Sequence, residues 1–363
     1  MEQEYFSDWE FVMSLMPFGW KEKFKELKVL KFGRKFTGAD KESKLLRVLM
    51  LHLGTGASLR ETSVLAAEGG IADISDVGIL KRLRKSEDFF VWCINSFLPD
   101  SQIKELNNLS NGLRFRILDA SVVTEPGATG SNWWLHYSID MKTLRCDEIK
   151  ITDARTGEGV KNFSVARNEV ILADRAYGRR TNIELLSDAG AYILCRFSPR
   201  HLPLHTTDGL ASFQLLPNLR KLKLGEIGEW DVAVKYPDGH LVSGRVCAVK
   251  KPSEAAEKSK KKVCRKSVLA QTKLQPVTLE YAEYTMIFTT LPQSAFPAEN
   301  IMKIYRLRWQ IEILFKRLKS ILALGHLHKY DEQSVRAWLS GKIFTSLLIE
   351  RIIQAGESFF PCR

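Results

Sequence analysis

The segment Glu169-Val170-Ile171-Leu172-Ala173-Asp174 places an acidic residue directly after four apolar residues. An apolar run of this length is typical of a strand that is buried on both faces of a sheet. A helix is expected to follow, from about Thr181 to Ala189, and Gly190 should end it. A further strand is expected from Ala191 to Phe197. The acid therefore stands at the carboxyl end of a predicted central strand.

Three strands are predicted upstream of this segment. They run from Arg114 to Leu118, from Trp133 to Ile139 and from Cys146 to Thr152. Strands that first follow one another and then alternate with helix predict a mixed sheet and an α/β fold class. Asp119 follows the first of these strands, so it is a second acid at the end of a predicted strand.

The stretch from about Phe213 to Phe288 has the pattern of strands and turns without a clear helix. A hairpin is predicted from Trp230–Tyr236 and Leu241–Val249, which flank a turn at Pro237-Asp238-Gly239. Tyr284–Thr289 is predicted to be the last strand. The lysine-rich segment that begins at Lys250 and runs to Lys266 is polar, and we expect a mobile loop there.

The first 108 residues are expected to be mostly helical. Ser58 and Glu61 have the spacing of a capping box, and Ser75 should cap the next helix, which we expect to carry its four cations outward: Lys81, Arg82, Arg84 and Lys85. Helices on either side of Gly69-Gly70 are compatible with a DNA-binding helix-turn-helix and equally with a small helical bundle.

The bulk properties favour a polyanionic partner. The 363-residue chain carries a formal net charge of +12 and has a pI near 9.3, although a lysine-rich solvated surface would give the same balance. Six scattered cysteines without a CxxC pair indicate reduced thiols and argue against a zinc site. We find no secretory signal and no apolar run of membrane-spanning length, and we expect a cytoplasmic protein without a membrane partner.

A polar stripe is predicted on one long helix. Tyr305, Arg308, Glu312 and Lys319 fall within a stripe about 60° wide on a helical projection. The apolar residues lie on another side, which we expect to be the core face: Leu307, Ile311, Leu314, Leu318 and Ile321. One carboxylate is thus surrounded by groups that bind phosphate.

The three acids Asp119, Asp174 and Glu312 are candidates for one metal site. Each strand-end acid alone is as well explained as the cap of a turn or helix. Together, three carboxylates without histidine or cysteine suit Mg²⁺ or Mn²⁺ rather than zinc. Two such ions, about 3.5–4 Å apart, catalyse in-line phosphoryl displacement, and by its place in the sheet Asp119 is the ligand that we expect both ions to share.

The spacing Tyr305-x2-Arg308-x3-Glu312-x6-Lys319 resembles the signature of bacterial insertion-sequence transposases of the DDE type, in the insertion-sequence-four branch. Leu118-Asp119-Ala120-Ser121 resembles the first-acid motif of that family. Ala173-Asp174-Arg175-Ala176-Tyr177-Gly178 resembles the second. The resemblance covers about residues 110–330.

The resemblance implies an RNase H-like core that is interrupted by a mostly β insertion domain. It divides the chain into an N-terminal helical DNA-binding region (1–108), a first part of the core (109–200), the insertion domain (201–290), a second part of the core with the Glu312 helix (291–330) and a short C-terminal helical tail (331–363). The 138 positions from Asp174 to Glu312 leave room for the insertion.

The family's activity is cut-and-paste transposition, by nicking at element ends, hairpin formation and reopening, and strand transfer into target DNA. The resemblance implies double-stranded DNA as partner, both terminal inverted repeats and target, a homodimer on DNA, and a nucleoid-associated location in a bacterial cytoplasm. Asp119, Asp174 and Glu312 would hold two Mg²⁺ or Mn²⁺ ions. Tyr305, Arg308 and Lys319 would hold phosphates.

Two further assignments leave an alternative open. Tyr284 is the candidate for stacking on a flipped base, although a core tyrosine would have the same place in sequence. The cations from Lys258 to Lys266 belong either to a solvated loop or to a non-specific DNA clamp.

Two other functions are compatible with these residues. One is a decayed or repurposed DNA-binding protein, and the other is a nuclease of the same core that never joins ends. Only 38 residues follow Gly325, whereas several family members use a longer C-terminal region to pair subunits. The sequence leaves open whether this end supports an active assembly.

Overall fold

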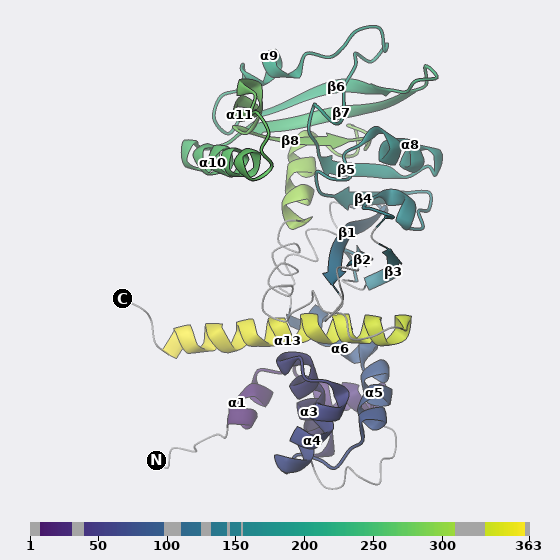
Figure 1. Ribbon diagram of the computed structural model, residues 1–363, viewed down its shortest axis with the longest axis vertical. Coiled ribbons are helices and arrows are strands. Elements are labelled where there is room, and N and C mark those ends of the chain that lie inside the picture. Colours follow the sequence, from purple (N-terminus) through teal and green to yellow (C-terminus); the bar gives the residue numbers. More distant parts are fainter. Residues whose placement is uncertain are drawn as a thin grey trace.

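The computed structural model describes residues 8–30, 40–97, 110–124, 132–143, 146–153, 155–308 and 331–359. It places a helical bundle at one end of the molecule and a long sheet at the other (Figure 1). The helix α13 (Glu332–Phe359) lies across the molecule between the two. Both ends of the described chain therefore belong to the same, helical part.

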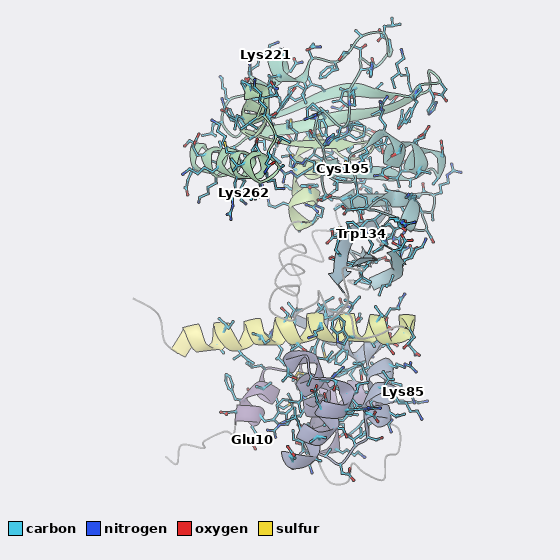
Figure 2. All side chains as sticks on the ribbon, in the orientation of Figure 1. Glu10, Lys85, Trp134, Cys195, Lys221 and Lys262 are labelled. Carbon is cyan, nitrogen blue, oxygen red and sulfur yellow. The ribbon has the colours of Figure 1, made fainter. Side chains whose placement is uncertain are left out.

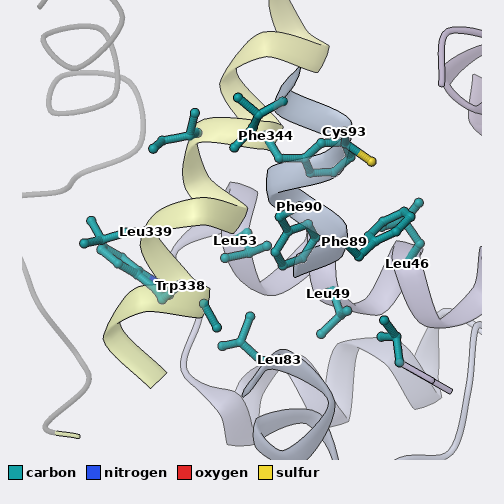
Figure 3. Packing of buried hydrophobic residues seen from close by; sticks show 14 of the residues in the cluster. Leu46, Leu49, Leu53, Leu83, Phe89, Phe90, Cys93, Trp338, Leu339 and Phe344 are labelled. Atoms are coloured by element: carbon teal, nitrogen blue, oxygen red, sulfur yellow. The ribbon is translucent and has the colours of Figure 1, made fainter. Parts of the chain in front are cut away.

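The helical bundle combines N-terminal and C-terminal segments. Its N-terminal helices are α1 (Asp8–Ser14), α2 (Trp20–Glu26), α3 (Lys41–Thr55), α4 (Leu59–Glu68), α5 (Asp76–Lys85) and α6 (Glu87–Phe97). Phe344 of α13 stacks on Phe90 of α6 with ring centroids 5.4 Å apart, and both rings are fully buried. Figure 3 shows these rings among leucines of α3 and α5. The segment expected to be a short helical tail is thus a core element of the bundle.

The predicted helix caps are confirmed. Ser58 and Glu61 form a capping box at the start of α4, and the Ser75 hydroxyl accepts a hydrogen bond from the Gly78 N–H at the start of α5. The expectation that all four α5 cations point outward is wrong for two of them. Arg82 donates to the Val29 carbonyl, and Arg84 binds Asp331 and Ser334. These two guanidiniums hold the bundle together and are not part of a free basic surface.

A mixed sheet of eight strands forms the other part. The strands are β1 (Arg114–Thr124), β2 (Asn132–Asp140), β3 (Cys146–Asp153), β4 (Glu169–Ala173), β5 (Tyr192–Arg196), β6 (Ile227–Lys235), β7 (Leu241–Lys250) and β8 (Tyr284–Thr289). Their order is β3-β2-β1-β4-β5-β8-β7-β6. β4 pairs in parallel with β1 and β5, and the other pairs are antiparallel. The β6–β7 hairpin and β8 therefore continue the sheet of the first five strands.

The two faces of the sheet have separate cores. One face packs against Phe296 and a helix over residues 298–308, through residues such as Ile117, Leu172 and Ile287. The other packs against η1 (Val160–Asn162), α8 (Arg180–Asp188) and α9 (Leu215–Leu219). Because side chains alternate along each strand, a residue's position in its strand fixes the face on which it lies.

The expected loop around Lys258–Lys266 is wrong, because the structure forms α10 (Ser253–Leu269) there, followed by α11 (Pro276–Tyr281). Ala256 is the single buried residue of α10, so the helix has almost no apolar periodicity. Alanine, glutamate and lysine favour helix, and the ion pair Glu254–Lys258 joins neighbouring turns. Among the described helices, none has the length and apolar character needed to cross a membrane.

Candidate active site

The first two acids of the predicted triad lie side by side. Ile117 of β1 pairs with Leu172 of the parallel strand β4, and Asp119 and Asp174 each follow this pair two residues later. Adjacent strands are about 4.8 Å apart. Asp119 lies inside β1, which continues to Thr124, and not after its end as predicted. The parallel pairing with β4 stops at Ile117, however, so both acids stand where the central sheet opens.

Asp119 is held by a tyrosine of the neighbouring strand. The Tyr137 hydroxyl donates to Asp119 Oδ2 at 2.5 Å, and these two residues are direct partners in the β1–β2 register. Burial, and then the negative charge of Asp119, raise the pKa of Tyr137 well above its usual value. Tyr137 was not singled out from the sequence, although the antiparallel pairing of two predicted strands would have placed it there.

Asp174 is held by its own turn. Its Oδ1 accepts a hydrogen bond from the Ala176 N–H at 2.6 Å. A Cβ on Gly178 would lie 2.8 Å from the Arg196 carbonyl oxygen, so this turn packs directly against the end of β5. The glycine of the second-acid motif thus allows a close approach of two backbones.

Both acids influence the same buried hydroxyl. Tyr177 is fully buried, and its pKa is raised by burial and then by Glu158, Asp119 and Asp174. The thiol of Cys195, labelled in Figure 2, similarly has its pKa raised by burial and by Asp174, while Arg308 lowers it. The charges of Asp119 and Asp174 thus both act on the Tyr177 hydroxyl, and those of Asp174 and Arg308 on the Cys195 thiol.

The helix over residues 298–308 brings its polar signature toward this edge. Ala298, Ile301, Ile304, Tyr305 and Arg308 are its buried residues, at helical spacing. Leu307, the one described residue of the expected core face, is half-buried and packs against this core, while Ile311, Leu314, Leu318 and Ile321 lie outside the described residues. Tyr305 and Arg308 are buried as well, so the polar side of the helix is also covered. The Arg308 guanidinium carbon lies 4.6 Å from the centroid of the Tyr305 ring, a cation–π contact.

Glu312 and Lys319 lie outside the described residues. Within the described ranges no three histidine, cysteine or acidic side chains come together as a metal site. The two described acids fit a hard divalent cation: both are oxygen ligands, they lie on neighbouring strands, and a hydrogen bond at one oxygen of each orients it.

Tyr284 does not join this group. Its side chain is 3% exposed, and it packs with Tyr281, Met286 and Phe288 on the other face of the sheet from Asp119. Stacking on a base requires an exposed ring face, so the assignment of Tyr284 to a flipped base conflicts with its position.

A model of the transposase DDE domain matches residues 147–348. The match includes Asp174 and the complete helical signature, and Asp119 precedes it. The chain is 32% identical to the putative transposase InsL for insertion sequence element IS186A of Escherichia coli (strain K12), over 87% of this chain and 86% of the relative.

Two other relatives cover a comparable share of the chain. The transposase for insertion sequence element IS421 of Escherichia coli is 33% identical, over 87% of this chain and 86% of the relative. The transposase for IS231F of Bacillus thuringiensis subsp. israelensis is 22% identical, over 89% and 75%.

The domain match and the extent of these alignments agree with the paired acids at the sheet edge. A DDE domain implies the use of a divalent metal ion and an enzyme that acts on DNA in transposition. The chain belongs to the DDE transposases of bacterial insertion sequences.

Proposed function

We propose that Asp119, Asp174 and Glu312 hold two Mg²⁺ or Mn²⁺ ions at the edge of the central sheet, where the chain cleaves DNA at element ends and joins them to a target. The observation that carries this proposal is the pairing of Ile117 with Leu172, which Asp119 and Asp174 each follow two residues later on neighbouring strands. When bound, such ions activate the attacking water or hydroxyl and stabilise the leaving oxygen.

The residues of the chain have distinct tasks in this proposal. Tyr137 fixes one oxygen of Asp119, and the Ala176 N–H fixes one oxygen of Asp174, so each carboxylate is oriented before a ligand binds. Arg308, held on the Tyr305 ring, supplies a planar pair of N–H donors for phosphate oxygens. Lys319 would supply a second positive charge beside the same phosphate.

The first five strands support an RNase H-like core made of residues 109–200 and 291–330. β4 lies between two parallel neighbours, and the helix over residues 298–308 packs on the face that carries Asp119. Residues 201–290 are then the insertion, which extends the edge of β5 by three strands. Residues 1–108, on whose described helices α13 packs, would bind the terminal inverted repeats of two element ends in a homodimer.

Cleavage of the element's own terminal repeats tests the metal assignment. With Mg²⁺, we expect Asp119→Asn, Asp174→Asn and Glu312→Gln each to abolish nicking while the affinity for the repeats is kept. Retained nicking in any of the three would reject that residue as a ligand. A wild-type chain that binds the repeats but never nicks them would instead identify a DNA-binding protein.

Strand transfer separates transposition from simple hydrolysis. Pre-cut repeat ends are mixed with a supercoiled target and Mg²⁺, and covalent joining is followed on a denaturing gel. We expect joined products from the wild type. Nicking without joining would indicate a nuclease, and hairpin products on the element ends would support the cut-and-paste route.

A further inference from the structure

A group of cations gathers beside Asp174 without acidic partners. Arg175 follows Asp174 directly, and Arg196 ends β5, where the register with β4 places it next to Asp174. Both arginines are exposed. In the described part of the chain neither forms an ion pair or a side-chain hydrogen bond, and Asp174 is the one acid that the strand register places beside Arg196.

Lys251 adds a half-buried charge to this group. Its Nζ donates to the Ser259 hydroxyl at 3.0 Å and to the Ala282 carbonyl at 2.8 Å, both neutral acceptors. Its pKa falls to about 8 because of burial and then because of the positive charges of Arg196, Arg175 and Lys262. Such a concentration of like charge is unfavourable unless an anion binds among them.

The face of α10 continues the same positive surface. Cations stand at helical spacing on its outer side, at positions 258, 261, 262, 265 and 266, and Figure 2 labels Lys262 among them. Lys258 pairs with Glu254, and Lys260 on the inner side pairs with Glu257 and Glu283. Lys261, Lys262, Arg265 and Lys266 are exposed and have no acidic partner among the described residues. About 7.5 Å of helix, from Lys261 to Lys266, thus presents unneutralised charge.

We propose that Arg175, Arg196, Lys251 and Lys262 bind backbone phosphates of the DNA strand next to the scissile phosphate, and that the outer face of α10 follows the same backbone away from the active site. This cationic track, defined as these four residues with Lys261, Arg265 and Lys266, rests on the proposed function, because the scissile phosphate is placed at Asp174. The track should bind DNA without sequence preference, since the phosphates are the same at every nucleotide.

The test measures the affinity of the full chain for a fluorescent duplex from the element end at several salt concentrations. Arg196→Gln with Lys262→Gln removes two charges of the track. The control, Lys221→Gln with Lys223→Gln, removes two exposed charges near α9, and Figure 2 shows Lys221 well apart from Lys262. Each lost phosphate contact should reduce the slope of log K against log salt by about 1.

We expect the track variant to reduce the slope by about 1 to 2 and the control to leave it unchanged. A wild-type slope in the track variant would overturn the proposal, and so would an equal loss in both variants. If the track variant unfolds, Lys261→Gln with Arg265→Gln on the outer face of α10 replaces it and should reduce the slope by a similar amount.

A neutral methylphosphonate, placed in turn at the phosphates around the cleavage point, locates the contact. At one or two positions the methylphosphonate should lower the affinity of the wild type and leave the affinity of the track variant unchanged. Equal sensitivity of both proteins at every position would contradict the assignment. Asp174→Asn, measured in parallel, should keep the salt slope and lose nicking, so failure of the metal assignment and failure of the track are seen separately.

Discussion

The hydrogen bond from Tyr137 to Asp119 shows how one residue prepares the site. A tyrosine that fixes one carboxylate oxygen sets the direction of the other. Groups of this kind around a metal ligand typically change metal affinity or activity by about 10- to 100-fold when they are removed. We expect Tyr137→Phe to reduce Mg²⁺-dependent nicking by a similar factor, with a higher Mg²⁺ concentration needed for half-maximal rate.

The shift in Mg²⁺ dependence distinguishes positioning from simple damage to the fold. Tyr137→Phe keeps the buried ring, so its melting temperature should remain close to that of the wild type. A variant with the wild-type Mg²⁺ profile and rate would show that Asp119 does not depend on Tyr137.

The lowered pKa of Lys251 predicts that the chain takes up protons when it binds DNA. Its ammonium faces Arg196 at the end of β5, Arg175 after β4 and Lys262 of α10, and its pKa is about 8 in the free protein. Bound phosphates favour the charged form, so the pKa rises on DNA binding, and at pH 8 about half a proton per chain should be taken up. Calorimetry in two buffers with different ionisation enthalpies measures this uptake.

Two substitutions serve as comparisons for the proton measurement. Lys251→Met should abolish the uptake, and Lys221→Met should preserve it. The same uptake in wild type and Lys251→Met would show that another group takes up the proton.

Residues of the site differ in how far the sequence alone could place them. Asp174 follows a strand whose predicted bounds are those of β4. The apolar pattern of β1 stops near Asp119, where the pairing with β4 ends, whereas the strand continues to Thr124 on its partner β2. Tyr284 was chosen by its distance along the chain, but alternation in β8 turns it to the other face. The number of residues between two positions does not determine on which face of the sheet a side chain lies, whereas the pairing of its strand does.

At the level of the element, the turn after β4 depends on Gly178. Its neighbour is backbone, the Arg196 carbonyl, which cannot rotate away from an added methyl group. Overpacking of this kind costs about 1–3 kcal/mol. We expect Gly178→Ala to lower the free energy of unfolding by this amount and to slow nicking, because the turn that orients Asp174 must shift.

Gly54 in α3 provides the control for Gly178→Ala, since a Cβ at Gly54 would meet no atom within 4 Å. Gly54→Ala should leave the stability unchanged or raise it. Urea denaturation measures both variants, and equal stabilities of Gly178→Ala and wild type would contradict the close approach.

α10 illustrates why a helix was missed. Only one of its residues, an alanine, is buried, so α10 lacks the 3.6-residue apolar period that identifies most helices. Without that period, its lysine-rich composition favours the prediction of a loop. Ion pairs between turns and good helix-forming residues stabilise it instead. The fixed spacing of its cations follows from the helix and would not exist in a loop.

α13 should be essential for the stability of the helical bundle. Phe344 is fully buried between the α6 rings of Phe90 and Phe97, while Ile353 on the same helix is 54% exposed. Phe344→Ala should cost about 3–5 kcal/mol and Ile353→Ala about 0.5 kcal/mol or less. Similar costs for the two variants in urea denaturation would show that α13 does not close the core.

At the scale of the whole molecule, the mixed sheet and the helical first region are confirmed, because both rest on local patterns of apolar residues. Two features could not be derived in this way. The first is the pairing of β8 with β5, which joins the first five strands and the last three into a single sheet. The second is the packing of α13 on the N-terminal helices. Both are pairings between segments distant in sequence, for which no local signal exists.

The shape of the molecule is consistent with DNA held by both of its parts. The helical bundle and the sheet lie at opposite ends (Figure 1), and the acids are on the sheet face that carries the helix over residues 298–308. In the proposed arrangement the bundle recognises the terminal repeat, the acids cleave at its end, and the cationic track holds the adjoining backbone.

A change of metal preference tests the central claim most directly. Mn²⁺ accepts a sulfur ligand more readily than Mg²⁺ does, because Mg²⁺ is a harder ion. If Asp174 is a ligand, Asp174→Cys should lose nicking of the element ends in Mg²⁺ and regain it in Mn²⁺, whereas Asp174→Asn should remain inactive in both. Nicking by Asp174→Cys in Mg²⁺ at the wild-type rate would contradict the account.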